Sequence, residues 1–148
     1  MDLFSSLSSA RKETEISFNP AEAFAAIALA SVTADGYLAE EEIEGVITTL
    51  TRMQLFRSYS EDVLTRLFDK LGGIVKRQGK DALIKTAITS LPHHLHDTAF
   101  AVAADLILAD GEVAEEEERL LHYLYNYFDI PDETAKNIID VMVIKNKG

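Results

Sequence analysis

Two short segments carry the same carboxylate pattern, at a spacing that suits binding of a divalent cation. Residues 34–42 read Ala-Asp-Gly-Tyr-Leu-Ala-Glu-Glu-Glu and residues 109–117 read Ala-Asp-Gly-Glu-Val-Ala-Glu-Glu-Glu, identical at seven of nine positions. Carboxylate oxygens are the ligands that calcium, magnesium and manganese prefer, whereas zinc favours nitrogen and sulfur. The candidate metal ligands from these segments are Asp35, Glu42, Asp110 and Glu117.

The spacing is not that of a pair of EF-hand calcium loops. With Asp35 or Asp110 at position 5 of such a loop, the glycine, the aliphatic residue and the last glutamate fall where that motif expects them. Positions 1 and 3 are then Ser31 and Thr33 in the first copy and two leucines in the second. Because carboxylates are missing there, each loop supplies too few ligands, and the sequence excludes an EF-hand pair.

A purely structural explanation of the repeated pattern stays open beside the cation-binding one. Glycine can end a helix, and acidic residues at the next helix start complement its free N–H groups. Glu42 and Glu117 would lie near the third helical position, from which a glutamate can reach back to the cap. Ala39 and Ala114 stand where a capping serine or threonine is expected. The sequence therefore predicts an incomplete capping box at each helix start. It also places more acidic residues there than capping requires.

Asp105 and a group of histidines are the other candidate ligands. Asp105 interrupts an apolar segment, and its counterpart in the first copy is Ala30. A carboxylate there has to meet solvent or a basic residue, or bind a metal, since an isolated buried charge is costly. Residues 93–97, His-His-Leu-His-Asp, hold three of the four histidines, and exposure at a helix start is their favoured interpretation. Asp105 is therefore the fifth candidate metal ligand.

The net charge of −11 is concentrated in two acidic blocks. Residues 13–49 and residues 91–118 each contain eight acids and no lysine or arginine, while residues 50–90 contain eight bases and four acids. Such a chain is expected to bind neither nucleic acid nor an anionic membrane surface. It has no cysteine, which excludes disulfides and thiolate-bound zinc. Neither a signal peptide nor a membrane-length apolar run is visible, so we expect a cytoplasmic protein without membrane insertion.

Hydrophobic periodicity predicts an all-α fold of about seven helices in a single domain. The predicted helices cover about residues 20–33, 39–55, 60–76, 81–91, 94–108, 114–128 and 132–144. The first helix, which Asn19-Pro20 opens, and the fifth are apolar on nearly every face and should be buried and central. Gly72-Gly73 is expected to kink or end the third helix, and residues 76–80 to form a loop.

The predicted domain is a bundle of two pseudo-symmetric repeats, each centred on an Asp-Gly turn. A partly flexible N-terminal segment, residues 1–19, precedes it. Repeat 1 covers about residues 20–78, a connecting helix about 80–91, and repeat 2 about 93–146.

The two Ala-Asp-Gly-x-x-x-x-x-Glu motifs, each after an alanine-rich helix, resemble the tellurite-resistance protein B (TerB) family over about residues 20–146. The resemblance implies an all-helical bundle with pseudo-two-fold symmetry. It also implies a non-enzymatic role in tellurite resistance and related stress responses, with acidic residues that bind divalent metal. The family's motif residues correspond here to Asp35, Gly36, Glu42, Asp110, Gly111 and Glu117.

We therefore expect a stress-response module that binds divalent cations, a protein partner, or both, through its acidic Asp-Gly turns. The partner is expected to be a protein, either soluble or membrane-associated, and the chain a monomer or a homodimer. A metal-independent interaction bundle is the alternative. An enzyme is not expected, because no nucleophile with a base, phosphate-binding loop or dinucleotide fingerprint is present, and a hydrolase built on acids and His122 lacks a matched set of groups.

Overall fold

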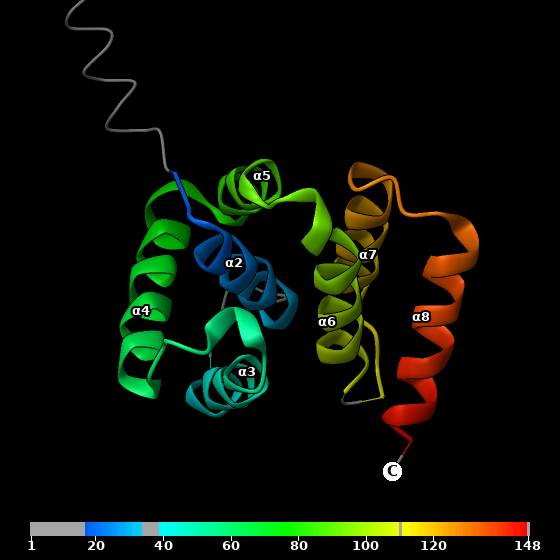
Figure 1. Cartoon of the computed structure of the whole chain (residues 1–148), viewed down its shortest axis with the longest axis horizontal. Coiled ribbons are helices and arrows are strands. Elements are labelled where there is room, and N and C mark those ends of the chain that lie inside the picture. The colour runs from blue at the N-terminus through cyan, green and yellow to red at the C-terminus, as the bar shows by residue number, and fades with distance from the viewer. Residues whose placement is uncertain (1–16, 34–38, 110, 148) are drawn as a thin grey trace, which may run out of the picture.

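The computed structural model describes residues 17–33, 39–109 and 111–147 (Figure 1). Over these residues it contains seven α-helices, two 3₁₀ helices and no strand, which confirms the all-α prediction. The helices are α2 (Pro20–Val32), α3 (Glu40–Thr51), η1 (Gln54–Phe56), α4 (Glu61–Gln78), α5 (Lys80–Ser90), η2 (His93–Leu95), α6 (His96–Leu108), α7 (Glu115–Tyr127) and α8 (Asp132–Lys145). The predicted ligands Asp35 and Asp110, and most of the N-terminal segment, lie outside the described residues.

Helix α2 is buried on nearly every face, as predicted. Ten of its 13 residues are buried, six of them alanines. It packs against α3, α4, α5 and α6, whose approach is eased by the small alanine side chains. Asn19 forms a complete capping box with Glu22, because the Asn19 side chain accepts from the Glu22 N–H at 2.8 Å and the Glu22 side chain accepts from the Asn19 N–H at 3.0 Å.

Helix α6 connects α2 to the C-terminal helices. It lies between α2 on one side and α7 and α8 on the other (Figure 1). Its buried residues are Ala99, Phe100, Ala103, Ala104 and Ile107. Half-buried residues separate them, Ala101 and Asp105 among them, so α6 is less enclosed than its sequence predicts.

The predicted end of the third helix at Gly72-Gly73 and the predicted loop over residues 76–80 are both wrong. Helix α4 continues through Gly72 and Gly73, because an apolar stripe with Leu71 and Ile74 anchors it on both sides of the glycines. This packing outweighs the low helix propensity of glycine, which costs about 1 kcal/mol per residue. Residues 76–80 are not a loop either, since Gly79 alone separates α4 from α5. With φ of +93° and ψ of 160°, Gly79 adopts a backbone conformation that other residues rarely reach.

The two kinds of glycine predict opposite effects of the same substitution. Gly72→Ala should raise the free energy of unfolding by about 0.5–1 kcal/mol, because an added Cβ meets nothing within 4 Å and alanine favours the helix. Gly79→Ala should lower it by about 1–2 kcal/mol, because of its positive φ. Urea denaturation followed by circular dichroism measures both. Equal effects of the two substitutions would contradict this description of the α4–α5 junction.

Candidate functional site

The acidic helix starts are the glutamates that open α3 (residues 40–42) and α7 (residues 115–118). On α3, the side chains of Glu40, Glu41 and Glu42 are exposed and make no hydrogen bond or ion pair with any residue that the structure describes. The backbone of Ala39 begins the helix in extended conformation without a side-chain cap. Three adjacent carboxylates thus face solvent at the positive end of the helix dipole.

The start of α7 uses one of its carboxylates as a cap. Glu117 reaches back, and its Oε1 accepts from the Ala114 N–H at 2.8 Å. This is the glutamate half of a capping box, formed although alanine offers no side chain in return. Glu115 pairs with Arg119 at 3.2 Å, but these side chains are 84% and 68% exposed, so the pair contributes little to stability.

The residues at EF-hand positions 1 and 3 of the first copy are engaged within α2. The Ser31 hydroxyl donates to the Ile27 carbonyl at 2.9 Å, and the Thr33 hydroxyl donates to the Leu29 carbonyl at 3.0 Å. Both residues are buried. Their hydroxyls therefore serve the helix backbone, in agreement with the exclusion of an EF-hand.

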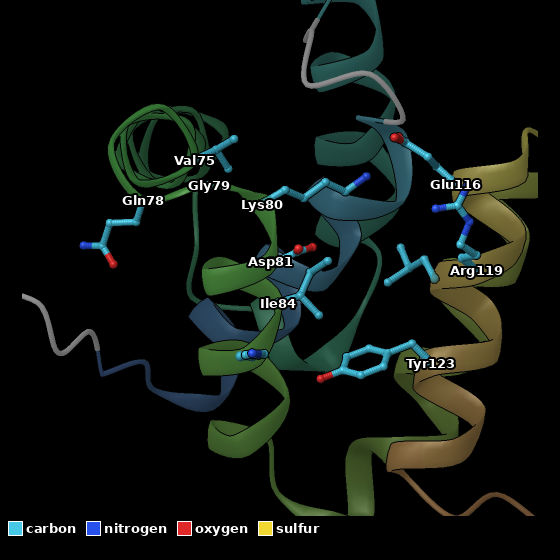
Figure 2. A pocket seen from close by; sticks show the side chains of 11 residues that line it. Val75, Gln78, Gly79, Lys80, Asp81, Ile84, Glu116, Arg119 and Tyr123 are labelled. Carbon is cyan, nitrogen blue, oxygen red and sulfur yellow. The ribbon is translucent and has the colours of Figure 1, made fainter.

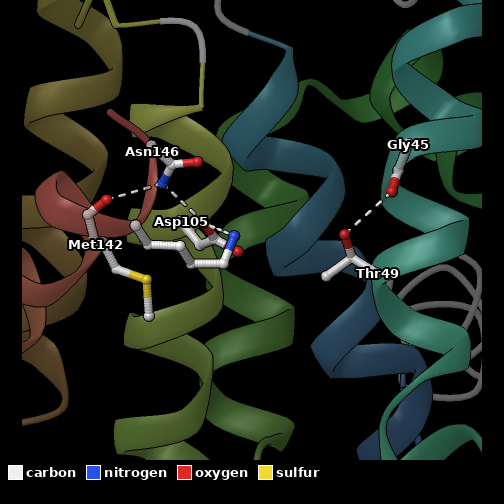
Figure 3. Close-up of polar contacts among 6 residues, drawn as sticks. Gly45, Thr49, Asp105, Met142 and Asn146 are labelled. Atoms are coloured by element: carbon white, nitrogen blue, oxygen red, sulfur yellow. Dashed lines mark hydrogen bonds and ion pairs between the residues drawn. The ribbon is translucent and has the colours of Figure 1, made fainter. Parts of the chain in front are cut away.

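Asp105 joins α6 to the C-terminal end of α8 (Figure 3). One of its oxygens accepts from Lys145 Nζ at 3.1 Å and from Asn146 Nδ2 at 2.9 Å. Asn146 Nδ2 also donates to the Met142 carbonyl at the end of α8. Since the Asp105 side chain is 20% exposed and already has two donors, its carboxylate is explained by this contact without a metal.

A cleft that no sequence pattern predicts lies between the α4–α5 junction and α7 (Figure 2). It has a volume of about 990 Å³, with Ile84 and Leu120 among its apolar lining residues. Lys80 extends from the start of α5 and donates to the Thr33 carbonyl at 2.7 Å, which neutralises the negative end of α2. Glu116 lines the same cleft from the acidic start of α7. Lys80, which contacts the residue that ends α2, and Glu116, from the acidic start of α7, therefore line one cleft.

Most of the histidine segment is exposed, which agrees with its favoured interpretation, and His96 is the exception. His93 and His94 face solvent, but His96 is half-buried. Its ring stacks on Phe128, with centroids 4.1 Å apart, and its Nε2 donates to the Leu91 carbonyl at 3.0 Å. His96 is thus part of the packing between α6 and α7.

Neither a metal cluster nor a membrane helix is found in the part of the chain that the structure describes. No group of three or more histidine, aspartate or glutamate side chains converges among residues 17–33, 39–109 and 111–147. None of the helices in these ranges is long and apolar enough to cross a bilayer. The described carboxylates therefore form no complete site without Asp35 and Asp110.

Comparisons of the chain with protein-family models, with curated proteins and with solved structures found no match. The resemblance to the TerB family accordingly rests on the repeated motif residues and on the helical pattern around them.

Proposed function

We propose that this chain is a non-catalytic, TerB-like stress-response module whose two acidic Asp-Gly segments bind divalent cations. Asp35 with Glu42 would hold one cation, and Asp110 with Glu117 a second or a shared one. Their oxygen ligands suit calcium, magnesium or manganese better than zinc. Cation binding would in turn prepare the same surface for a protein partner.

The observation that carries this proposal is the state of the acidic helix starts. The glutamates of the α3 start are exposed and have no partner among the described residues. Like charges four positions apart on a helix, such as Glu40 and Glu44, destabilise it unless something offsets them. The helix dipole accounts for part of the compensation. The repetition of a glutamate run at the start of α7, where Glu117 caps the helix and Glu115 pairs with Arg119, favours a bound ion as the rest.

The donor set fits a cation in part. No described residue bonds the Glu42 carboxylate, and among the same residues only Oε1 of Glu117 is bonded, to the backbone N–H of Ala114. Asp105 does not belong to the proposed set, since Lys145 and Asn146 occupy it. The proposed ligands are therefore four of the five carboxylates predicted from the sequence.

Added cation should raise the melting temperature of the chelator-treated protein. At about 10 mM calcium, magnesium or manganese, a site with Kd near 1 mM stabilises the fold by about 1.4 kcal/mol, a rise of about 3–6 °C. The Asp35→Asn/Asp110→Asn variant should lose this rise. A matched control, Glu44→Gln/Asp69→Asn, removes two exposed charges elsewhere and should keep it. No rise with any of the three cations, or the same rise in both variants, would refute cation binding at these segments.

A metal-independent interaction module is the second candidate, and the cleft beside α7 favours it. Lys80 and Arg119 supply positive charge beside Glu116, so part of the acidic surface is balanced within the chain. In this case a basic protein would dock on the acidic helix starts without an ion. Co-precipitation that falls with salt but is unaffected by chelator would favour this candidate, and its loss on chelation would favour the cation-dependent one.

A further inference from the structure

A groove between α7 and α8 is separate from the acidic Asp-Gly segments. Both helices pack on α6, but they have few direct contacts with each other. The space between them has a volume of about 440 Å³. Phe100 of α6 lies at its base, with Leu121 and Tyr125 from α7 and Ala135 and Ile139 from α8. We call this feature the α7–α8 groove; its lining is largely apolar.

The groove is closed at one end and open at the other. Helices α7 and α8 run in opposite directions, and a short turn joins them (Figure 1). At that turn the Tyr125 hydroxyl donates to the Asp132 carboxylate, which bridges the two walls. Two helical turns away, about 10–12 Å along the axes, the walls end at Glu118 and Asp140. Beyond them, Val143 is 42% exposed and lies one turn after Ile139 on the same side of α8.

The charges at the open end have no partner of opposite sign among the described residues. Glu118 and Asp140 are exposed, and neither makes an ion pair there. Lys136 is the one lysine or arginine in the lining, and its other titratable side chains are those of His122, Tyr125 and Asp132. The rim of the groove therefore carries a net negative charge, and the floor that it surrounds is apolar.

We propose that the α7–α8 groove binds a basic amphipathic helix of a partner protein. Two or three apolar side chains at i, i+4 and i+7 would lie on the floor, because two helical turns match the length of the groove. Lysine or arginine one turn beyond them would meet Glu118 and Asp140. The groove meets the acidic start of α7 at Glu118, beside the proposed ligand Glu117, but none of the four proposed cation ligands lines it. The inference therefore goes beyond the proposed function and does not depend on a bound cation.

Charge selects this occupant over a second copy of the chain. Each copy carries a net charge of −11, and two acidic rims would repel each other on close approach. A basic helix gains from the same field, both in encounter rate and in the choice of partner. Complementarity of this kind gives specificity as well as attraction.

The test uses a labelled helical peptide and its two controls. An alanine-rich peptide of about 15 residues carries leucines at i, i+4 and i+7, with lysines one turn beyond. One control replaces the leucines by serine, and the other replaces the lysines by glutamate. Fluorescence anisotropy in about 100 mM salt should show saturable binding of the first peptide with Kd below about 1 mM and at least tenfold weaker binding of both controls.

Charge reversal of the protein locates the binding site. Glu118→Lys/Asp140→Lys should raise the Kd of the lysine peptide at least tenfold. The glutamate peptide should then bind more tightly than the lysine peptide. Glu44→Lys/Asp69→Lys, with its substitutions on α3 and α4, changes the net charge of the protein by the same amount. It should leave the Kd of the lysine peptide within about twofold, once the effect of net charge at the given salt concentration is corrected for. The Asp35→Asn/Asp110→Asn variant should bind the peptide as the unaltered chain does, which separates this inference from the cation hypothesis.

Three results would overturn the proposal. The first is no peptide binding up to about 1 mM. The second is equal weakening by the two charge-reversal variants, which would mean a general electrostatic attraction. The third is a dimer in sedimentation velocity that Glu118→Lys/Asp140→Lys dissociates, because a second copy would then cover the groove.

Discussion

Phe24→Ala should lower the free energy of unfolding by about 3–5 kcal/mol, the largest effect that we expect from a single substitution. Phe24 is 1% exposed on the central helix α2. Its ring meets that of Phe56 edge to face, with centroids 6.1 Å apart. The substitution removes this aromatic pair and leaves a cavity. The cavity cannot close, because α2 is packed against helices on several sides. Urea denaturation followed by circular dichroism at 222 nm measures the change.

Two further variants keep this prediction falsifiable. Phe24→Leu retains much of the buried volume and should cost about 1–2 kcal/mol, so it remains measurable even if Phe24→Ala unfolds. Tyr127→Ala removes an aromatic ring of similar size that is 47% exposed, and should cost less than about 1 kcal/mol. Similar losses for Phe24→Ala and Tyr127→Ala would contradict the central position of α2.

Asp105→Ala should lower the free energy of unfolding by about 2–3 kcal/mol, because two donors lose a carboxylate that is mostly shielded from water. The substitution places alanine at the position that corresponds to Ala30 in the first copy. Helix propensity therefore favours the variant slightly. Any loss in the free energy of unfolding then reports on the lost contact with α8. The cation-dependent rise in melting temperature should stay intact, since Asp105 is not among the proposed ligands.

A double-mutant cycle between Asp105→Ala and Asn146→Ala assigns this loss to the α6–α8 contact. Coupling of at least about 0.5 kcal/mol is expected for groups in direct contact. Lys145→Ala should show weaker coupling, because the Lys145 side chain is 57% exposed and solvent screens its charge. Additive effects of Asp105→Ala and Asn146→Ala, or loss of the cation response in Asp105→Ala, would contradict the structural role given to Asp105.

Local signals explain which parts of the fold the sequence predicts. Asn19 and Pro20 mark the start of α2 through capping chemistry that involves three neighbouring residues, and the structure confirms that start. The course of α4 at its glycines depends instead on tertiary packing, since buried Leu71 and Ile74 carry the helix through Gly72 and Gly73, whereas it ends before Gly79, which has a positive φ. Glycine alone therefore does not tell a helix interior from a helix boundary.

The partners of the candidate site residues depend on contacts across the chain. Lys145 and Asn146 lie 40 and 41 positions after Asp105, and Lys80 lies 47 positions after Thr33. A periodic pattern specifies which face of a helix is buried, but not which distant side chain reaches it. The carboxylates can be identified from the sequence. Which of them bind basic residues or the backbone is known only from the folded structure.

Anomalous diffraction from crystals grown with manganese would locate any cation bound at the acidic Asp-Gly segments. We expect an anomalous peak within coordination distance, about 2–2.6 Å, of carboxylate oxygens at Asp35 and Glu42, at Asp110 and Glu117, or at both. The peak should be absent from crystals of the Asp35→Asn/Asp110→Asn variant. Ordered acidic segments without a peak, at a manganese concentration of about 10 mM, would contradict cation binding there and leave the metal-independent module as the function.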